Sequence, residues 1–179
     1  MGKLTAITFI TLDNVVEDPH LWSGAYQSDD TDQLNDEILR ESDVLLLGRV
    51  TYEGFAAAWP SRSGDSISDK LNSMPKYVVS GTLEQADWNP STIIAGDVLE
   101  RVRGVKADQN ALVWGSSTLV ASLMHEDLVD EHVLLMSPIV RREGIKLFRD
   151  AGGPHDLKIT GSTVLGGGML ALRLEPART

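Results

Sequence analysis

The sequence predicts an α/β protein with a mostly parallel sheet, helices on both faces of that sheet, and an antiparallel edge. Short apolar runs, which suit strands buried on both faces, alternate with segments whose apolar residues recur at helical spacing. Near the C-terminus, two strand-like segments are joined by three consecutive glycines, which is typical of a hairpin. Together these patterns favour a layered α/β architecture over an all-helical or all-β one.

The expected strands are short apolar or alternating runs bounded by polar and turn-forming residues. In chain order they are 4–12, 44–47, 77–79, 92–95, 111–114, 133–136, 157–165 and 169–174. The last two flank Gly166-Gly167-Gly168 and form the predicted C-terminal hairpin.

The expected helices are segments in which apolar residues return every three or four positions. They lie around 30–41, 49–59, 68–73, 98–105 and 119–124. Asp97 precedes the fourth of them as a candidate side-chain cap. No internal repeat or low-complexity linker interrupts the chain, so we expect residues 1–179 to form a single domain.

The composition limits the classes of partner. The net charge is -10, with 42% hydrophobic and 23% charged residues, so nucleic acid and anionic membrane surfaces are not expected partners. An anionic small molecule stays possible, because a local pocket can be positive on an acidic protein. The chain has no cysteine, which excludes disulfides and thiolate chemistry. The N-terminus lacks a signal-peptide pattern and no stretch is long enough to span a membrane, so we expect a cytoplasmic protein.

Two strand-to-helix turns suggest a ligand site. One strand runs into Gly48 and Arg49, and another runs into Gly115 and Ser116. Ligands bind at the carboxyl ends of strands in open α/β sheets, where a glycine permits close approach and the N–H groups of a first helical turn favour a phosphate. Arg49 adds a donor that binds a phosphate in two places. Two such turns in one sheet predict a dinucleotide site.

Each turn also has a simpler interpretation. Arg49 could be an exposed side chain on an ordinary strand–turn–helix unit, and Ser116 and Ser117 could serve only as helix caps. A third apolar strand ends in Ser80-Gly81-Thr82, where Ser80 and Thr82 could bond a ribose or its phosphate, or could simply form a turn.

The order of these segments resembles a known family, which groups dihydrofolate reductase with the reductase domain of the bifunctional riboflavin-biosynthesis deaminase–reductase. The similarity is strongest to short, stand-alone bacterial members of the riboflavin branch. The segments that carry it are TLDNVVEDP (11–19), DVLLLGRVTYEGFAAAWP (43–60), MPKYVVSGTL (74–83) with Trp88, LVWGSSTLVASL (112–123), and LVDEHVLLMSPIV (128–140) followed by Lys146-Leu147-Phe148. The resemblance implies a dihydrofolate reductase-like three-layer α/β/α fold.

The resemblance also implies NADPH as the cofactor, rather than NADH. In the family, residues at the positions of Arg49 and Ser80 lie near the 2′-phosphate, and Thr51 with the turn after Gly115 cradles the pyrophosphate. Related reductases form dimers, so a homodimer is expected. The full set of expected cofactor residues is Gly48, Arg49, Thr51, Ser80, Gly81, Thr82, Gly115, Ser116, Ser117, Thr118 and Leu119.

Three positions depart from the family pattern. The usual S-L-D-G is Thr11-Leu12-Asp13-Asn14, although Asn tolerates left-handed backbone and can keep the turn. A glycine of the later glycine-rich segment is replaced by Arg142, which is expected to reshape that loop. The turn after Trp114 has one glycine where many relatives have two.

The substrate is expected between the first strand and the helix after Gly48. Asp13 is the acid best placed to transfer a proton, with a turn-forming role as the alternative. Thr11, Trp22 and Tyr52 are the expected substrate contacts, with the aromatic rings forming a wall for a planar heterocycle. The four histidines lack metal-binding spacing, so no metal is expected.

The resemblance therefore implies an NADPH-dependent reductase of a pteridine- or pyrimidine-type small molecule, like 5-amino-6-(5-phosphoribosylamino)uracil reductase. The alternatives are a nucleotide-binding protein without turnover and a dihydrofolate reductase-like reductase of another substrate.

Overall fold

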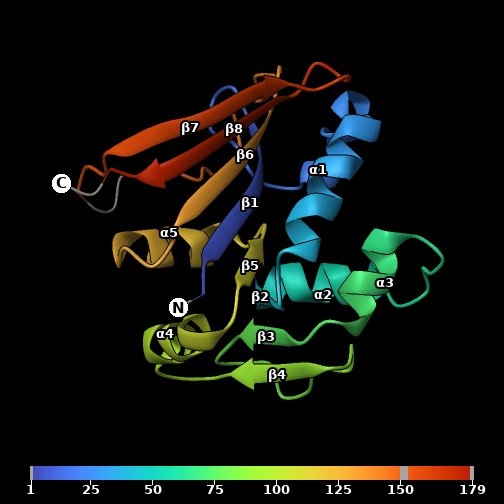
Figure 1. Cartoon of the computed structure of the whole chain (residues 1–179), viewed down its shortest axis with the longest axis vertical. Helices are drawn as coiled ribbons and strands as arrows, with labels where there is room; N and C mark the ends of the chain where they lie inside the picture. The colour runs from blue at the N-terminus through green and yellow to red at the C-terminus, as the bar shows by residue number, and fades with distance from the viewer. Residues whose placement is uncertain (1, 150–152, 178–179) are drawn as a thin grey trace.

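One eight-stranded sheet organises the computed structural model, which describes residues 2–149 and 153–177 (Figure 1). The strand order is β4-β3-β2-β5-β1-β6-β8-β7. The first six positions pair in parallel, while β8 pairs antiparallel with both β6 and β7. The strands are β1 (Leu4–Thr11), β2 (Val44–Gly48), β3 (Lys76–Val79), β4 (Ser91–Ile94), β5 (Ala111–Trp114), β6 (Glu131–Ser137), β7 (Leu157–Val164) and β8 (Leu170–Pro176).

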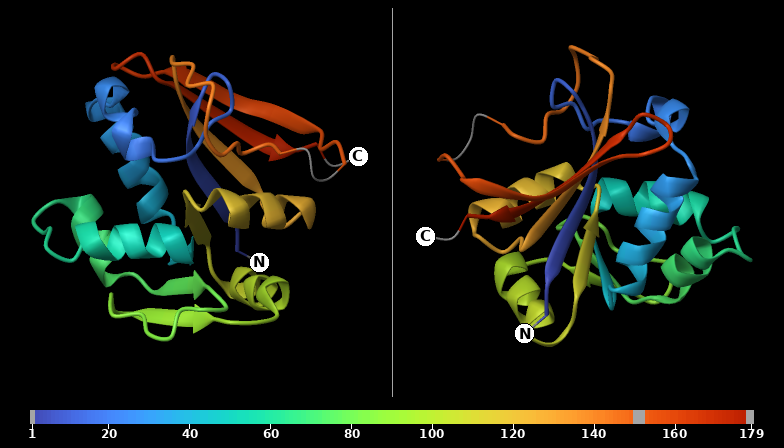
Figure 2. Two further views of the ribbon diagram at one scale, coloured as in Figure 1. Left: turned by 180° about the vertical axis from the view of Figure 1, so that it is seen from behind. Right: turned by 45° about the horizontal axis from the view of Figure 1, so that its top comes forward.

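Helices cover both faces of this sheet (Figure 2). One face carries α1 (Asp29–Arg40), α2 (Arg49–Ala58) and α3 (Ser66–Ser73), and the other carries α4 (Val98–Asp108) and α5 (Ser117–His125). The short 3-10 helices Pro19–Leu21 and Gly24–Tyr26 precede α1. The predicted three-layer α/β/α fold with a C-terminal antiparallel hairpin is confirmed.

The strand alternation explains why two cores form. On β2, Val44 and Leu46 belong to the core beneath α4 and α5, while Leu45 and Leu47 belong to the core beneath α1, α2 and α3. Successive side chains of a strand point to opposite faces, so a strand between two helical layers must be apolar throughout. The uninterrupted apolar runs of the sequence are the result.

Element boundaries differ from the expected ones mainly at the ends. Strand β6 extends over Glu131–Ser137, beyond the expected 133–136, because its polar terminal residues also pair with β1. Asp97 occupies the position before α4, but its side chain makes no capping bond there; its backbone is left-handed, with φ 47°. The predicted side-chain cap at Asp97 is therefore wrong.

The turn of the C-terminal hairpin packs against the chain just before and at the start of α1. The amide of Gly166 donates a hydrogen bond to Asp30 Oδ2 at 2.8 Å. A Cβ placed on Gly167 would lie 1.9 Å from the carbonyl oxygen of Tyr26, so only glycine fits there. This contact fixes the hairpin to the α1 layer.

No helix among the described residues is long and apolar enough to cross a membrane.

Candidate functional site

Two neighbouring strands, β2 and β5, deliver two helix N-termini to the same edge of the sheet. Strand β2 runs directly into α2 at Arg49, and β5 is followed two residues later by α5. Hydrogen bonds join the two turns: the Gly48 amide donates to Ser116 Oγ at 2.9 Å, and the Ser116 amide donates to Thr51 Oγ1 at 3.1 Å. The first turns of α2 and α5 are thereby held side by side.

The backbone of the second turn is left-handed at two successive residues, Gly115 with φ 68° and Ser116 with φ 53°. Glycine accepts this conformation without cost, whereas a side chain there is strained. A Cβ at Gly115 would also touch Thr51 Cγ2 at 3.4 Å. The hydroxyl of Ser116 accepts the Gly48 amide instead of capping α5. The interpretation of Ser116 as a side-chain helix cap is wrong.

A cavity of about 620 Å³ lies at these helix N-termini. The N–H groups of a first helical turn have no partner within the helix, so they form a ready site for an anion. Apolar side chains extend the cavity away from the turns, and they come from the end of β3 and the start of α4. The residues that line it are Gly48, Arg49, Val50, Thr51, Val79, Val98, Leu99, Ser116, Ser117, Thr118, Leu119, Ser122, Leu123, His125, Glu126 and Ile145.

Arg49 lies at the exposed side of this cavity. Its guanidinium contacts both carboxylate oxygens of Glu53 at 3.0 Å, one turn along α2. Both side chains are about half exposed, at 44% and 47%, and such surface pairs contribute little to stability. The guanidinium is therefore free, at small cost, to turn toward an anion in the cavity.

The structure brings seven of the eleven expected cofactor residues to the cavity and leaves four outside its lining. Those that line it are Gly48, Arg49, Thr51, Ser116, Ser117, Thr118 and Leu119, and those that do not are Ser80, Gly81, Thr82 and Gly115. Gly115 acts indirectly, since it shapes the turn behind Thr51.

Ser80 forms a local turn. Its hydroxyl accepts the amides of Thr82 and Leu83 at 3.1 and 2.9 Å, and the residue is only 8% exposed. In this structure Ser80 therefore acts as a turn residue, which was the simpler of its two interpretations. The preceding residue, Val79, lines the cavity.

Sequence reasoning missed the apolar part of the cavity. Val98 and Leu99 belong to the apolar stripe of the helix expected at 98–105, and both line the cavity. Ile145 comes from the β6–β7 connection, and no local pattern in that polar segment indicates that it returns to the sheet edge. Only the tertiary contacts of the connection reveal it.

Asp13 holds this connection in place. Its carboxylate accepts the amides of Arg141 and Arg142 at 3.1 and 2.6 Å, and the hydroxyl of Thr11 donates to it at 2.7 Å. The Thr11 hydrogen bond, with support from the two amides, lowers the pKa of Asp13 from 3.8 to about 2. A carboxyl group with this pKa carries no proton at neutral pH, and a role of Asp13 in proton transfer stays a prediction. In this structure Asp13 fixes the loop that contains Arg141 and Arg142.

We expect Asp13→Asn to loosen the β6–β7 connection. An amide accepts these N–H bonds less strongly than a carboxylate, so hydrogen exchange at Arg141 and Arg142 should accelerate several-fold. Because folding lowers the pKa of Asp13, its stabilising contribution is present above the unfolded value of 3.8 and is lost as the pH falls toward 2. Wild-type protein should therefore show the same loss of protection over that range. If the amides of Arg141 and Arg142 exchange at the wild-type rate in the variant at pH 7, Asp13 does not hold the connection.

The three expected substrate contacts are engaged inside the protein. Thr11 is fully buried, and its oxygen also accepts the Val15 amide at 2.9 Å. Trp22 is 5% exposed and donates its indole N–H to the carbonyl of Glu17. Tyr52 is 3% exposed, and its hydroxyl accepts the Trp88 amide. The expectation that Trp22 and Tyr52 form an open aromatic wall is corrected: both rings are core residues in this structure.

The two departures at usual glycine positions keep the glycine backbone. Asn14 and Arg142 have φ 73° and 71°. Asn14 also uses its side-chain amide, which donates to the carbonyl of Phe148 and accepts its amide. The prediction that Asn14 preserves the turn is confirmed, and Asn14 fastens the far end of the β6–β7 connection.

No side-chain hydrogen bond of the kind made by Asn14 offsets the left-handed backbone of Arg142. Arg142→Gly should therefore raise the free energy of unfolding by about 1 kcal/mol, because glycine adopts this backbone without strain. Chemical denaturation of both proteins measures the change. Arg141→Gly is the matched control, because Arg141 has ordinary backbone geometry, and it should be neutral or destabilising. Equal effects of the two substitutions would show that Arg142 is not strained.

No group of three or more acidic or histidine side chains among the described residues is arranged to hold a metal ion.

The fold, with the N-termini of α2 and α5 side by side at one sheet edge, defines a dihydrofolate reductase-like α/β protein. Dihydrofolate reductase from Enterococcus faecalis, complexed with NADP(H), superimposes with a TM-score of 0.66 at 16% identity, over 99% of this chain and 98% of that one. A putative riboflavin biosynthesis protein from Shewanella sp. PV-4 gives 0.81 at 19% identity, over 98% and 99% of the two chains.

Residues 2–171 match the RibD C-terminal domain, and the chain belongs to that family. Among curated proteins, the uncharacterized protein YyaP of Bacillus subtilis is 27% identical over 142 residues, which cover 76% of this chain and 75% of that protein.

Proposed function

We propose that this protein is a reductase that binds NADPH in the 620 Å³ cavity and reduces a pyrimidine- or pteridine-type small molecule. The observation that carries the proposal is the pair of helix N-termini of α2 and α5, joined through Gly48, Thr51 and Ser116. Membership in the RibD C-terminal domain family supports reductase chemistry.

The residues present fit the cofactor. The paired N-termini supply backbone N–H groups for the pyrophosphate, and the hydroxyls of Ser117 and Thr118 stand beside them. Val79, Val98 and Leu99 form an apolar surface suited to a planar base. We assign the 2′-phosphate that distinguishes NADPH from NADH to Arg49, which lines the cavity and is held only by a surface pair with Glu53.

The bound cofactor supplies the hydride, and the chain positions it and the substrate. We place the substrate between the end of β1 and α2. Since the carboxylate of Asp13 is ionised and bonded to the β6–β7 connection, we propose that the proton required by the product comes from solvent at this exposed edge and not from Asp13.

A second candidate function is nucleotide binding without turnover. It is favoured by the same observation on Asp13, because the acid expected to act in proton transfer has a structural role. Cofactor binding is common to both candidates, so only hydride transfer separates them.

The test is an anaerobic assay of NADPH oxidation with 5-amino-6-(5-phosphoribosylamino)uracil, its dephosphorylated form and dihydrofolate as alternative substrates. The proposal predicts stoichiometric loss of NADPH with at least one of them, and slower loss with NADH. NADPH binding without oxidation by any of the three supports the second candidate. Absence of NADPH binding would reject both.

A further inference from the structure

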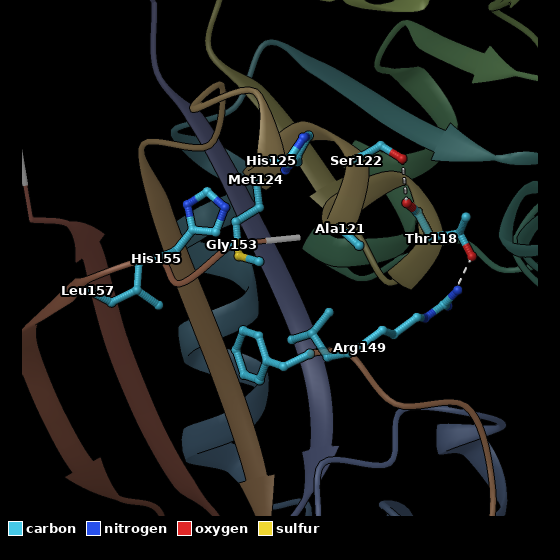
Figure 3. A pocket seen from close by; sticks show the side chains of 11 residues that line it. Thr118, Ala121, Ser122, Met124, His125, Arg149, Gly153, His155 and Leu157 are labelled. Atoms are coloured by element: carbon cyan, nitrogen blue, oxygen red, sulfur yellow. Dashed lines mark hydrogen bonds between the residues drawn. The ribbon is translucent and has the colours of Figure 1, made fainter. Parts of the chain in front are cut away.

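The side chain of Arg149 extends from the β6–β7 connection to the first turn of α5 (Figure 3). Its Nη2 donates a hydrogen bond to Thr118 Oγ1 at 3.1 Å and lies 3.5 Å from Ser117 Oγ. Its Nε donates to the carbonyl oxygen of Lys146 at 3.0 Å, which fixes the orientation of the guanidinium. Thr118 and Ser117 also line the 620 Å³ cavity, so Arg149 contacts two hydroxyls of the proposed cofactor site.

The turn after β1 fixes the backbone from which Arg149 extends. The side-chain amide of Asn14 donates to the carbonyl of Phe148 at 2.9 Å and accepts the amide of Phe148 at 3.1 Å. The backbone carbonyl of Asn14 accepts the amide of Leu147 at 3.1 Å. Because the two residues before Arg149 are held in this way, placing the guanidinium at α5 costs side-chain entropy but little backbone entropy.

The hydrogen bond from Arg149 decides in which direction the hydroxyl of Thr118 donates. A hydroxyl group has one hydrogen and two lone pairs. Since the oxygen of Thr118 accepts from the guanidinium, its hydrogen points away from Arg149, and none of the described residues accepts that hydrogen. A cationic donor at the oxygen also makes the hydroxyl a stronger donor, because hydrogen bonds in a chain polarise one another. The arrangement therefore suits an anion in the cavity as the acceptor.

We propose that Arg149 is a positioning residue for the cofactor pyrophosphate, because it orients and polarises the hydroxyl of Thr118 at the N-terminus of α5. Arg149 is not among the residues that line the cavity, so it acts through the hydroxyl and not by direct contact. This inference rests on the proposed function, since it requires the pyrophosphate to bind in the cavity. NADPH and NADH share the pyrophosphate, so Arg149 contributes to the binding of both, whereas Arg49 contributes to NADPH alone.

Fluorescence titration of the full-length protein with NADPH and with NADH tests this role. Arg149→Gln should weaken both dinucleotides equally, by about five-fold, because each loses one oriented and polarised hydroxyl donor. Arg149→Lys retains a cationic donor and should restore part of the affinity. The ratio of the NADPH and NADH dissociation constants should stay at the wild-type value in both variants.

A double-mutant cycle with Thr118→Val separates this role from a general effect of charge or structure. Valine keeps the shape of threonine and removes the hydroxyl through which Arg149 is proposed to act. In the Thr118→Val background, Arg149→Gln should therefore change the affinity by less than about two-fold. A guanidinium that acted on the phosphate over a distance, or that only stabilised the connection, would have the same effect in both backgrounds.

Lys158→Gln is the matched control, because it removes an exposed cation of β7 and should leave both affinities unchanged. Arg149 is itself exposed, so the variants should fold, and thermal melting of each one checks this. If the wild-type protein binds neither dinucleotide, the proposed function fails and this inference fails with it. If the wild type binds both, the inference alone is overturned when Arg149→Gln binds them as tightly, when it weakens NADPH only, or when its effect persists in Thr118→Val.

Discussion

Arg49→Gln is expected to weaken NADPH binding about thirty-fold while NADH binding changes little. A charge-assisted bond to a phosphate is worth roughly 2 kcal/mol, which corresponds to a factor of about thirty in the dissociation constant. NADH has no 2′-phosphate, so it gains nothing from the guanidinium. The measurement is a fluorescence or calorimetric titration of each protein with each dinucleotide.

The chain offers a close control for this substitution. Arg40 pairs with Asp36 at the same i,i+4 spacing at which Arg49 pairs with Glu53, but it lies on α1, away from the cavity. Arg40→Gln should therefore leave both affinities unchanged. Glu53→Gln should tighten NADPH binding slightly, because it releases the guanidinium from its surface partner. A parallel loss of NADH and NADPH affinity in Arg49→Gln would refute the assignment of Arg49 to the 2′-phosphate.

Gly167→Ala is expected to be the most destabilising single-methyl substitution of the C-terminal hairpin. The added Cβ would lie 1.9 Å from the Tyr26 carbonyl oxygen, so the hairpin turn or the chain before α1 must move. Overpacking against a backbone atom costs about 3 kcal/mol, which lowers Tm by roughly 6–12 °C for a chain of this size. Differential scanning calorimetry measures the shift.

Gly96→Ala is the corresponding control, because nothing lies within 4 Å of a Cβ at that position and its backbone is not left-handed. It should change Tm by only a degree or two. If Gly167→Ala melts like Gly96→Ala, the hairpin turn does not pack against Tyr26 as closely as the structure indicates.

The fold was predictable because its signals are local. Val44 to Leu47 of β2 and all of β5 are apolar, which indicates burial on both faces, and Gly48 and Gly115 mark the turns into the following helices. Gly166-Gly167-Gly168 indicates a hairpin without any knowledge of its neighbours. Such features depend on the backbone and on strand periodicity, both of which can be read from a few adjacent residues.

The two strand-to-helix turns of the candidate site were predictable for the same reason. Gly48, Arg49, Thr51 and the turn after Gly115 lie next to the strands that position them. The rest of the site depends on contacts between distant residues. Asp13 meets Arg141 and Arg142 across more than one hundred residues, and no local pattern indicates that its carboxylate anchors this loop. Tyr52 fits an amphipathic stripe equally well as a ligand wall or as core, and only its hydrogen bond with Trp88 decides between them.

The central claim is that the joined N-termini of α2 and α5 bind NADPH, and amide chemical-shift mapping of labelled protein during NADPH titration tests it most directly. The account predicts that the largest shifts fall on Gly48, Arg49 and Thr51 in one turn and on Ser116 and Ser117 in the other. If these amides do not shift and the changes fall instead around His155 and Leu157, the account is contradicted.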